Sequence, residues 1–299
     1  MRAKRNGCIM DDKAYEPPAF TEHFKAMPPG TLYHYTGQAG LLGIVESKEL
    51  WATKIQYMND ASEFGLALRM ARNELEAIIN TSKFPADKPA GVKLQESLRG
   101  LEDINICASC FCEDGDLLSQ WRGYAGGQHG YAIGFGTDEL AEISHRSGFV
   151  LGRCIYDRAL QRKIVQEAVA YCLQNEYAIP FGRRWGYHGP LADILFRCGV
   201  FFKDASFKDE KEWRLVSPTL RYDADPLRFR VGTSMVTPFY ALSIATDGEL
   251  PIQHIVVGPC PHMELSKFSV TSLLMRYGNE GPLRGEQVAL GSIIPYRDW

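Results

Sequence analysis

The stretch of residues 31–63 constrains the fold more than any other part of this 299-residue chain. It opens with the short strand-like run LYHYTG at residues 32–37, and apolar residues then recur at helical spacing over residues 41–49. A second strand-like run covers residues 50–57 and leads into a long amphipathic segment. This order predicts a βαβ-like opening, in which one helix joins two strands.

Two polar residues of this opening, His34 and Thr36, stand where the first strand gives way to the helix. The first turn of a helix leaves backbone N–H groups without partners, and the helix dipole adds positive potential there. Such a place suits a phosphate or another anion. His34 and Thr36 therefore form the first candidate site in the chain.

The rest of the chain mixes helices and strands without strict alternation. The clearest helix covers residues 60–80, where one apolar stripe is formed by Phe64, Leu68, Ala71, Leu75 and Ile78. Residues 83–89 read as a loop, and strand-like runs follow at residues 104–112, 131–135, 149–156 and 211–217 and closer to the C-terminus. This pattern predicts an α+β fold with a mixed, mostly antiparallel central sheet flanked by amphipathic helices. We expect a single domain over residues 29–299, preceded by an arm over residues 1–28 that lies across it.

The composition is that of an ordinary globular protein, with 45% hydrophobic and 23% charged residues. A net charge of -3 gives no overall attraction to nucleic acid or to anionic membranes, so any nucleic-acid surface has to be local. No apolar run reaches the length needed to span a bilayer, and the N-terminal segment lacks the apolar core of a signal peptide. We therefore expect a cytoplasmic protein without a membrane partner.

Most of the eight cysteines lie inside apolar segments, as buried thiols do in a reducing compartment. The cluster CASCFC at residues 107–112 has to be tested as a zinc site. In a strand, side chains three residues apart point to opposite faces, so Cys107 and Cys110 diverge. No second CxxC and no His pair stands at zinc spacing. No metal is expected.

Glu210 and Glu212 form the sharpest pair of candidate catalytic residues. In a strand they share one face, because side chains alternate with period two. One carboxylate of such a pair can stabilise the cationic sugar of an oxocarbenium-like transition state, while the other takes a proton from the nucleophile. The alternative is a solvated strand edge, in which the carboxylates pair with neighbouring cations such as Arg214.

Four motifs carry a family resemblance: HYT at residues 34–36, NDxxE at 59–63, WxxYA at 121–125 and ExEWRL at 210–215. As a set they resemble a bacterial domain family of unknown function, DUF2971. The front half of that family is in turn similar to ADP-ribosyltransferases of the histidine–tyrosine–glutamate kind. This similarity implies an enzyme that uses NAD as substrate and modifies nucleic acid or protein. A bacterial toxin or an anti-phage effector is the implied biological setting.

The resemblance to these transferases implies a role for each matching residue. His34 would hydrogen-bond the adenosine-side ribose, and Tyr35 or Tyr57 would stack on the nicotinamide ring. Glu212 would bond the ribose hydroxyl beside the reacting carbon, and Glu210 would act as the base. The expected NAD-binding set is completed by Thr36, Asn59, Trp121, Tyr124 and Arg214. We expect the strands of His34 and Glu212 to be adjacent or nearly so, with both side chains on one face of the sheet.

Two other functions stay open. A metal-dependent nuclease or phosphodiesterase would bind a divalent cation through the carboxylates of Asp60, Glu63, Glu210 and Glu212. A non-catalytic module would contact nucleic acid or protein through the RRW run at residues 183–185.

Structural roles compete with the functional ones. His34 is also compatible with a satisfied core histidine, and Trp121 with Tyr124 is compatible with a packed helix face. The Ser-Thr-Ser motif of the arginine-modifying transferases is absent from its expected place before Glu212, which disfavours that branch.

Asp60 is expected to cap the helix over residues 60–80, with Glu63 completing a capping box. Asp60→Ala should then lower the free energy of unfolding by about 0.5–2 kcal/mol and leave ligand binding mostly intact. Urea unfolding and an NAD titration of the variant check both outcomes. Loss of binding at unchanged stability would instead identify Asn59 and Asp60 as ligand contacts, a reading that the sequence leaves open.

Overall fold

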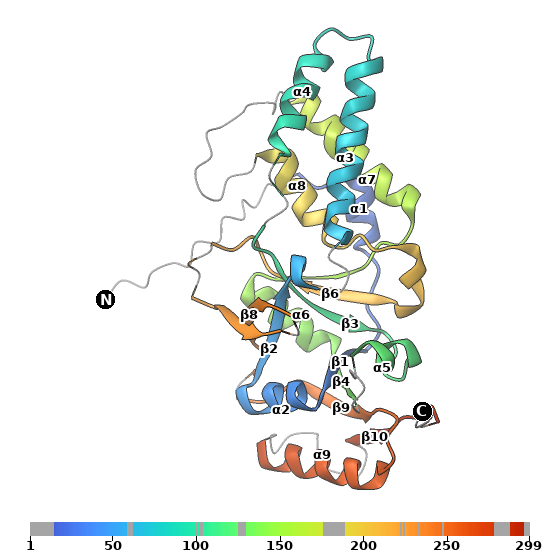
Figure 1. The fold of residues 1–299 in the computed structure, drawn as a ribbon, viewed down its shortest axis with the longest axis vertical. Helices are drawn as coiled ribbons and strands as arrows, with labels where there is room; N and C mark the ends of the chain where they lie inside the picture. Colours follow the sequence, from blue (N-terminus) through green and yellow to red (C-terminus); the bar gives the residue numbers. More distant parts are fainter. Residues whose placement is uncertain are drawn as a thin grey trace, which may run out of the picture.

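The computed structural model describes residues 15–58, 62–99, 101, 104–124, 130–175, 189–221, 223, 225–232, 234–246, 248–277 and 288–295. In this part of the chain the strands form one ten-stranded sheet, and α-helices pack around it (Figure 1). Across the same residues, no helix has both the length and the apolar character needed to cross a membrane.

The strands of the sheet are β1 (Thr31–Gly37), β2 (Glu49–Lys54), β3 (Cys107–Cys112), β4 (Gly130–Gly136), β5 (Val150–Arg153), β6 (Glu212–Val216), β7 (Leu227–Val231), β8 (Val236–Ser243), β9 (Ile252–Val257) and β10 (Ala289–Gly291). They are ordered β10-β9-β4-β1-β3-β2-β8-β7, with β6 paired to both β3 and β5. Every pairing is antiparallel except that of β10 with β9. The predicted α+β fold with a mixed, mostly antiparallel sheet is confirmed.

The helices are α1 (Pro18–His23), α2 (Gln38–Ser47), α3 (Ser62–Thr81), α4 (Asp87–Ser97), α5 (Leu118–Tyr124), α6 (Thr137–Ser147), α7 (Arg158–Gln174), α8 (Pro190–Gly199) and α9 (Met263–Tyr277). Figure 1 shows α1, α3, α4, α7 and α8 gathered at one end of the molecule, α2 and α9 at the other, and the strands between them. Two 3-10 helices, η1 (Ile55–Tyr57) and η2 (Ala205–Glu210), lie just after β2 and just before β6.

Two large hydrophobic cores, and a smaller cluster around Tyr35 and Trp121, hold these layers together. The bundle core lies among α1, α3, α4, α7 and α8, and it reaches the sheet at Ala108 and Val216. The sheet core lies between the strands and α2, α6 and α9, and Phe111 is completely buried in it. Because Ala108 and Phe111 belong to one strand but to different cores, β3 is buried on both faces.

The cysteines follow the same alternation along β3. Among the described residues, the cysteines are free thiols and all except Cys110 are buried. Cys107 belongs to the sheet core, whereas Cys110 pairs with Arg214 on the opposite face. The predicted divergence of Cys107 and Cys110 is confirmed.

The long helix predicted over residues 60–80 is α3, and its apolar stripe faces the bundle core. Leu68, Ala71 and Leu75 are 2%, 0% and 0% exposed. The predicted capping box lies outside the described residues, because it involves Asp60 and the side chain of Glu63.

The sequence analysis missed α4 and predicted a loop at residues 83–89. Pro89 lies in the first turn of α4, where a missing N–H is tolerated because that group has no partner inside the helix. Gly91 lets the helix approach α3, since a Cβ added there would lie 3.0 Å from Cγ1 of Ile79. Leu94 is 1% exposed in the bundle core. Packing against α3 therefore stabilises a helix that its own sequence hardly favours.

Glu210 and Glu212 do not share a strand, so their predicted common strand face is wrong. β6 begins at Glu212, whereas Glu210 ends η2. Lys211 between them has a φ of 44°, in the left-handed region, and the chain turns there. The reason lies at the start of η2, where the Asp204 carboxylate accepts a hydrogen bond from the backbone N–H of Ser206 and so stabilises a helical turn.

The segment before residue 28, expected as an arm, contains α1. Phe20 is 4% exposed, and its ring centroid lies 4.3 Å from that of Phe24 and 6.0 Å from that of Phe201. Gly152 of β5 approaches this aromatic cluster so closely that an added Cβ would lie 2.3 Å from the ring of Phe24. Residues of α1 therefore contribute directly to the bundle core.

Phe20→Ala should lower the free energy of unfolding by about 3–5 kcal/mol, because it removes a buried ring from this aromatic cluster. Met27→Ala is the matched control, since Met27 is 87% exposed in the same segment. The control should change stability by no more than about 0.5 kcal/mol. Urea unfolding of both variants measures the difference, and equal stabilities would show that α1 contributes nothing to the fold.

Candidate functional site

An opening in the sheet lies along one edge of β3. β6 occupies the other edge throughout Ala108–Cys112. β1 and β2 must therefore both use the remaining edge, β1 at the pair Tyr33↔Cys112 and β2 at the pair Thr53↔Ala108. Both run antiparallel to β3 and hence parallel to each other, which confirms the βαβ-like opening predicted for this part of the chain. Neither strand pairs with residues 109–111, and we call the space between β1 and β2 there the notch.

A cavity of about 340 Å³ occupies the notch. One wall is formed by residues 33–37 of β1 and by residues of α2 between 39 and 44. The other wall comes from β2, η1 and the residue that follows it, and the back comes from β3. Gln120, Glu210, Glu212 and Arg230 complete the lining from other parts of the chain. A space of this size is large enough for a small molecule.

The notch brings together six of the ten site residues predicted from the sequence: His34, Tyr35, Thr36, Tyr57, Glu210 and Glu212. Two others lie behind its walls. Trp121 packs against Tyr35 and donates its indole N–H to Asp116 at 2.8 Å, and Arg214 is buried behind Glu212. Asn59 and the side chain of Tyr124 lie outside the described residues.

The strands of His34 and Glu212 are separated only by β3, as expected. The register nevertheless places Tyr33, Cys112 and Glu212 in one row across the sheet. Because side chains alternate along a strand, His34 points to the opposite face. The expectation that both side chains share one face is therefore wrong. They border the same cavity because the sheet is open between β1 and β2.

His34 closes the gap that the missing strand leaves on β3. Its Nδ1 lies 2.9 Å from the backbone carbonyl oxygen of Cys110, which can only accept, so Nδ1 carries the proton. Burial lowers the pKa of His34 below its ordinary value of 6.5, and the charge of Arg230 lowers it further. The Cys110 hydrogen bond opposes this shift without reversing it. At neutral pH the ring is uncharged, and its Nε2 is a hydrogen-bond acceptor.

The two candidate tyrosines differ in how firmly the protein holds their side chains. The Tyr35 hydroxyl donates to the carbonyl of Asp114 and accepts from the N–H of Leu117, both at 2.9 Å. Burial raises the pKa of Tyr35, and its ring packs edge-on against Trp121 at 4.7 Å. Tyr57, in contrast, is 39% exposed and lines the cavity. Tyr57 is therefore the ring that remains available for stacking.

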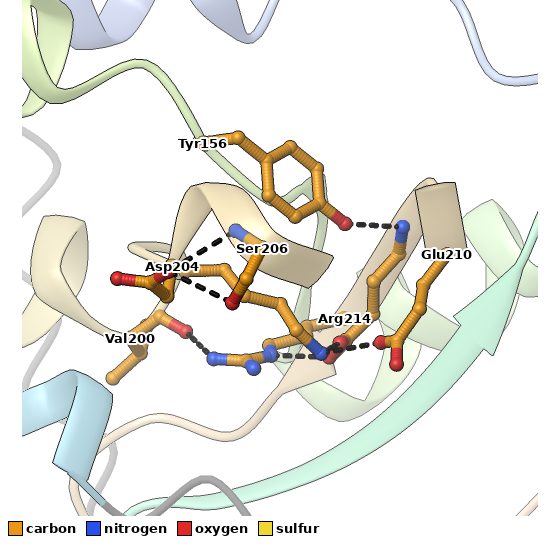
Figure 2. A network of polar contacts seen from close by, with 8 residues as sticks. Tyr156, Val200, Asp204, Ser206, Glu210 and Arg214 are labelled. Atoms are coloured by element: carbon orange, nitrogen blue, oxygen red, sulfur yellow. Dashed lines mark hydrogen bonds and ion pairs between the residues drawn. The ribbon is translucent and has the colours of Figure 1, made fainter. Parts of the chain in front are cut away.

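Glu212 lies in a buried network of polar contacts. Figure 2 shows this network, with Tyr156, Glu210 and Arg214 labelled. Its Oε1 accepts from Nε of Arg214 at 2.6 Å, and its Oε2 contacts the ammonium of Lys203. The backbone N–H of Glu212 donates to the Tyr156 hydroxyl at 2.8 Å, and Arg214 Nη1 donates to the carbonyl of Val200 at 2.6 Å. Glu212, Lys203 and Arg214 are all no more than 5% exposed.

The two cations keep Glu212 ionised. Burial by itself raises the pKa of Glu212, but Arg214 and Lys203 outweigh burial and lower that pKa to about 2. In the same way burial lowers the pKa of Lys203, but Glu212 and Glu210 raise it above its ordinary value. These groups are therefore charged throughout the physiological pH range.

Glu210 is the more accessible carboxylate. Its Oε2 accepts from Nζ of Lys203 at 2.6 Å, and 19% of its side chain is exposed. Lys203 thus bridges both glutamates even though they do not share a strand. Among the described residues the structure gives no partner to the second carboxylate oxygen of Glu210, so this oxygen is available to a ligand in the notch.

Several polar residues of this site were not among those predicted, including Gln120, Ser109 and Arg230 in the cavity lining and Lys203 behind it. A signal for Lys203 is present in the chain, because it ends the apolar run VFF shortly before ExE and had to be buried with an acidic partner. Ser109 and Arg230 carry no comparable signal, since only the sheet pairing brings them to the notch.

Metal binding by the described residues has no geometric support. No group of three or more His, Cys, Asp and Glu side chains is clustered there in a way that could hold a metal ion. The ammonium of Lys203 already lies between Glu210 and Glu212. The remaining two carboxylates of the nuclease hypothesis, Asp60 and Glu63, fall outside the described side chains.

Residues 120–215 match the family model described as "Protein of unknown function (DUF2971)". The matched span runs from Gln120 in α5 to Leu215 in β6 and contains both glutamates of the notch. The resemblance to this family is thereby confirmed. No curated protein and no solved structure matches the chain. A function therefore has to be argued from the notch itself.

The buried network predicts a specific dependence of stability on pH. Because the pKa of Glu212 is lowered from 4.5 to about 2, the ionised group stabilises the fold. This contribution is complete above pH 4.5 and is lost as pH falls towards 2. In Glu212→Gln this part of the acid dependence should disappear. The variant should also lose roughly 3–5 kcal/mol at neutral pH, because two buried cations then face one carboxylate fewer.

Urea unfolding of the parent and the variant between pH 2 and pH 7 measures both effects. Glu264→Gln is the control, since Glu264 belongs to an exposed ion pair with Lys267. It should change stability by less than about 1 kcal/mol. A Glu212→Gln variant with the stability and the acid profile of the parent would contradict the buried charge network.

Proposed function

We propose that the protein transfers ADP-ribose from NAD and that the dinucleotide binds in the notch. The observation that carries the proposal is the convergence on one cavity of His34 and Tyr57, from the two strand ends of the βαβ-like opening, with Glu210 from a distant part of the chain. These are the residue types that the resemblance to histidine–tyrosine–glutamate transferases implies. No single sequence motif contains all three residues, so only the fold brings them to one cavity.

His34 supports this proposal through its protonation state. A neutral imidazole with Nδ1 bonded to Cys110 presents Nε2 as an acceptor. A ribose hydroxyl is a suitable donor for that nitrogen. The β3 carbonyl also fixes the orientation of the ring, so the contact requires little reorganisation when the ligand binds.

The two glutamates take different roles from those inferred from the sequence. Both oxygens of Glu212 are held by Arg214 and Lys203, so we assign Glu212 to positioning Lys203 and, through it, Glu210. Glu210 keeps one oxygen for the ligand. We therefore place Glu210 beside the reacting ribose carbon, where its charge would stabilise the oxocarbenium-like transition state.

The reaction breaks the bond between the ribose carbon and the nicotinamide nitrogen. The bonding electron pair leaves with nicotinamide, which becomes neutral. A water molecule or an acceptor group forms the new bond to the ribose carbon and gives its proton to Glu210. Tyr57, exposed in the cavity wall, would stack on the nicotinamide ring before it departs.

No specific observation favours the other functions. The nuclease hypothesis needs Glu210 and Glu212 for a metal, but both contact Lys203. The binding-module hypothesis depends on residues 183–185, which lie outside the described residues. The setting that we propose, a bacterial toxin or anti-phage effector acting in the cytoplasm on nucleic acid or protein, rests on the family resemblance alone.

Glu210→Gln should reduce nicotinamide release from NAD by on the order of a hundredfold, because it removes a preorganised charge from the transition state. NAD affinity should change much less, since the charge acts mainly in the transition state. Asp209→Asn is the matched control, because Asp209 is an exposed carboxylate on the preceding residue. It should release nicotinamide at the rate of the parent.

His34→Ala should behave differently and weaken NAD binding, because His34 is assigned to the ground-state ribose contact. The measurements are nicotinamide release with and without a cell-extract acceptor, NAD titration, and urea unfolding to verify folding. A parent protein that neither binds nor cleaves NAD would end the proposal. So would a folded Glu210→Gln variant with the activity of the parent.

A further inference from the structure

Arg230 is a cation of the notch that no carboxylate of the described residues balances. Its Nη2 donates to the Thr53 hydroxyl at 3.0 Å, and its guanidinium lies 5.9 Å from the ring centroid of Trp51. No ion-pair partner of Arg230 occurs among the described residues. Arg228, on the same strand face two residues earlier, contacts Glu49 at 3.0 Å. Of these two arginines, the one that lines the cavity is left without an anion.

Ser109 provides an independent sign of a missing ligand. It is 3% exposed, it lines the cavity, and its hydroxyl makes no hydrogen bond in the described structure. A buried hydroxyl without a partner costs free energy, and native proteins rarely leave one unsatisfied. Ser109 lies in the stretch of β3, residues 109–111, that neither β1 nor β2 pairs with. A molecule in the notch can therefore reach it.

The first turn of α2 adds hydrogen-bond donors to the same cavity. Gly37, at the N-cap of α2, supplies no side-chain cap, so the backbone N–H groups of this turn are not satisfied by such a bond. Ala39 and Gly40 line the cavity beside it. Gly40 leaves room for the Thr36 hydroxyl, because a Cβ added at Gly40 would lie 2.0 Å from Thr36 Oγ1. This hydroxyl therefore lies at the N-terminus of α2, where the helix dipole favours negative charge.

We propose that Arg230, Ser109 and the first turn of α2 form a subsite for the diphosphate group of a nucleotide. The guanidinium and the helix turn belong to opposite walls of the notch, and a diphosphate offers one phosphoryl group to each. Serine hydroxyl and backbone N–H donors complete the set of hydrogen bonds that phosphate oxygens accept. The inference deepens the proposed function, but it holds for any ADP-containing ligand whether or not NAD is cleaved.

The charges elsewhere in the notch are compatible with an anion at this subsite. Glu210 and Glu212 carry two negative charges, and Lys203 and Arg214 balance them with two positive ones. Within the part of the lining that the structure describes, Arg230 is left as the cation without a paired carboxylate. A ligand is therefore oriented with its diphosphate towards Arg230 and its reacting sugar towards Glu210.

Isothermal titration of the full chain with ADP-ribose and with adenosine tests the subsite. Arg230→Gln should weaken ADP-ribose binding about ten- to hundredfold, the usual effect of losing a hydrogen bond to a charged group. Adenosine affinity should change less than about threefold, because adenosine lacks the diphosphate. Arg228→Gln removes the same charge from the same strand and should leave ADP-ribose affinity within about threefold of the parent.

Ser109→Ala adds a second readout. The variant should bind ADP-ribose several-fold more weakly, yet its unfolding midpoint without ligand should stay equal to or above that of the parent, because the lost hydroxyl has no partner. A lower midpoint would show that the hydroxyl is already satisfied within the protein, and would remove Ser109 from the subsite.

The subsite is overturned if ADP-ribose fails to bind the parent, if it binds parent and Arg230→Gln equally, or if adenosine binding falls as much as ADP-ribose binding. These outcomes are distinct from failure of the proposed function. Arg230-dependent ADP-ribose binding without any nicotinamide release would retain the subsite and reject the transferase. If Arg230→Gln releases nicotinamide with an unchanged KM for NAD, the transferase is retained and the diphosphate subsite is rejected.

Discussion

The notch exists because two strands must share one edge of β3. With β6 along the other edge, β1 pairs at one end of β3 and β2 pairs at the opposite end, and on their shared edge the middle residues have no strand beside them. Unpaired backbone carbonyls inside a protein are costly, so the fold has to satisfy them in another way. His34 does this by donating Nδ1–H to Cys110. The opening is therefore a fixed feature of the sheet, and the histidine that supports it is held in one tautomer.

The buried charges behind the notch connect its back wall to the helix bundle. Lys203 follows α8, whereas Glu212 begins β6, and their contact joins a helical segment to the sheet. A buried ion pair adds little net stability over an apolar contact, because desolvation offsets most of the attraction. The ion pair instead fixes the position of side chains. Both oxygens of Glu212 are bound by Arg214 and Lys203, and Lys203 in turn holds Glu210 at the cavity.

The notch is thereby polarised. A carboxylate with one uncommitted oxygen lies at one part of its lining, and an unbalanced guanidinium, an unsatisfied hydroxyl and a helix N-terminus lie at others. An NAD molecule has matching chemistry, with a cationic nicotinamide ribosyl group and an anionic diphosphate. With NAD as the proposed ligand, the carboxylate would face the developing positive charge and the donors would face the phosphates.

Sequence patterns alone correctly predicted the fold class, the βαβ-like opening, the stripe of Leu68, Ala71 and Leu75 on α3, and six residues of the site. Local periodicity and motif spacing carry that information, because they depend on neighbours within a few turns. Only the tertiary structure decided that Glu210 leaves the strand, that Lys203 joins the two glutamates, and that Arg230 and Ser109 face the same cavity. These facts depend on strand register and on burial of charge between segments far apart in the chain. No local pattern encodes which strand pairs with which end of β3.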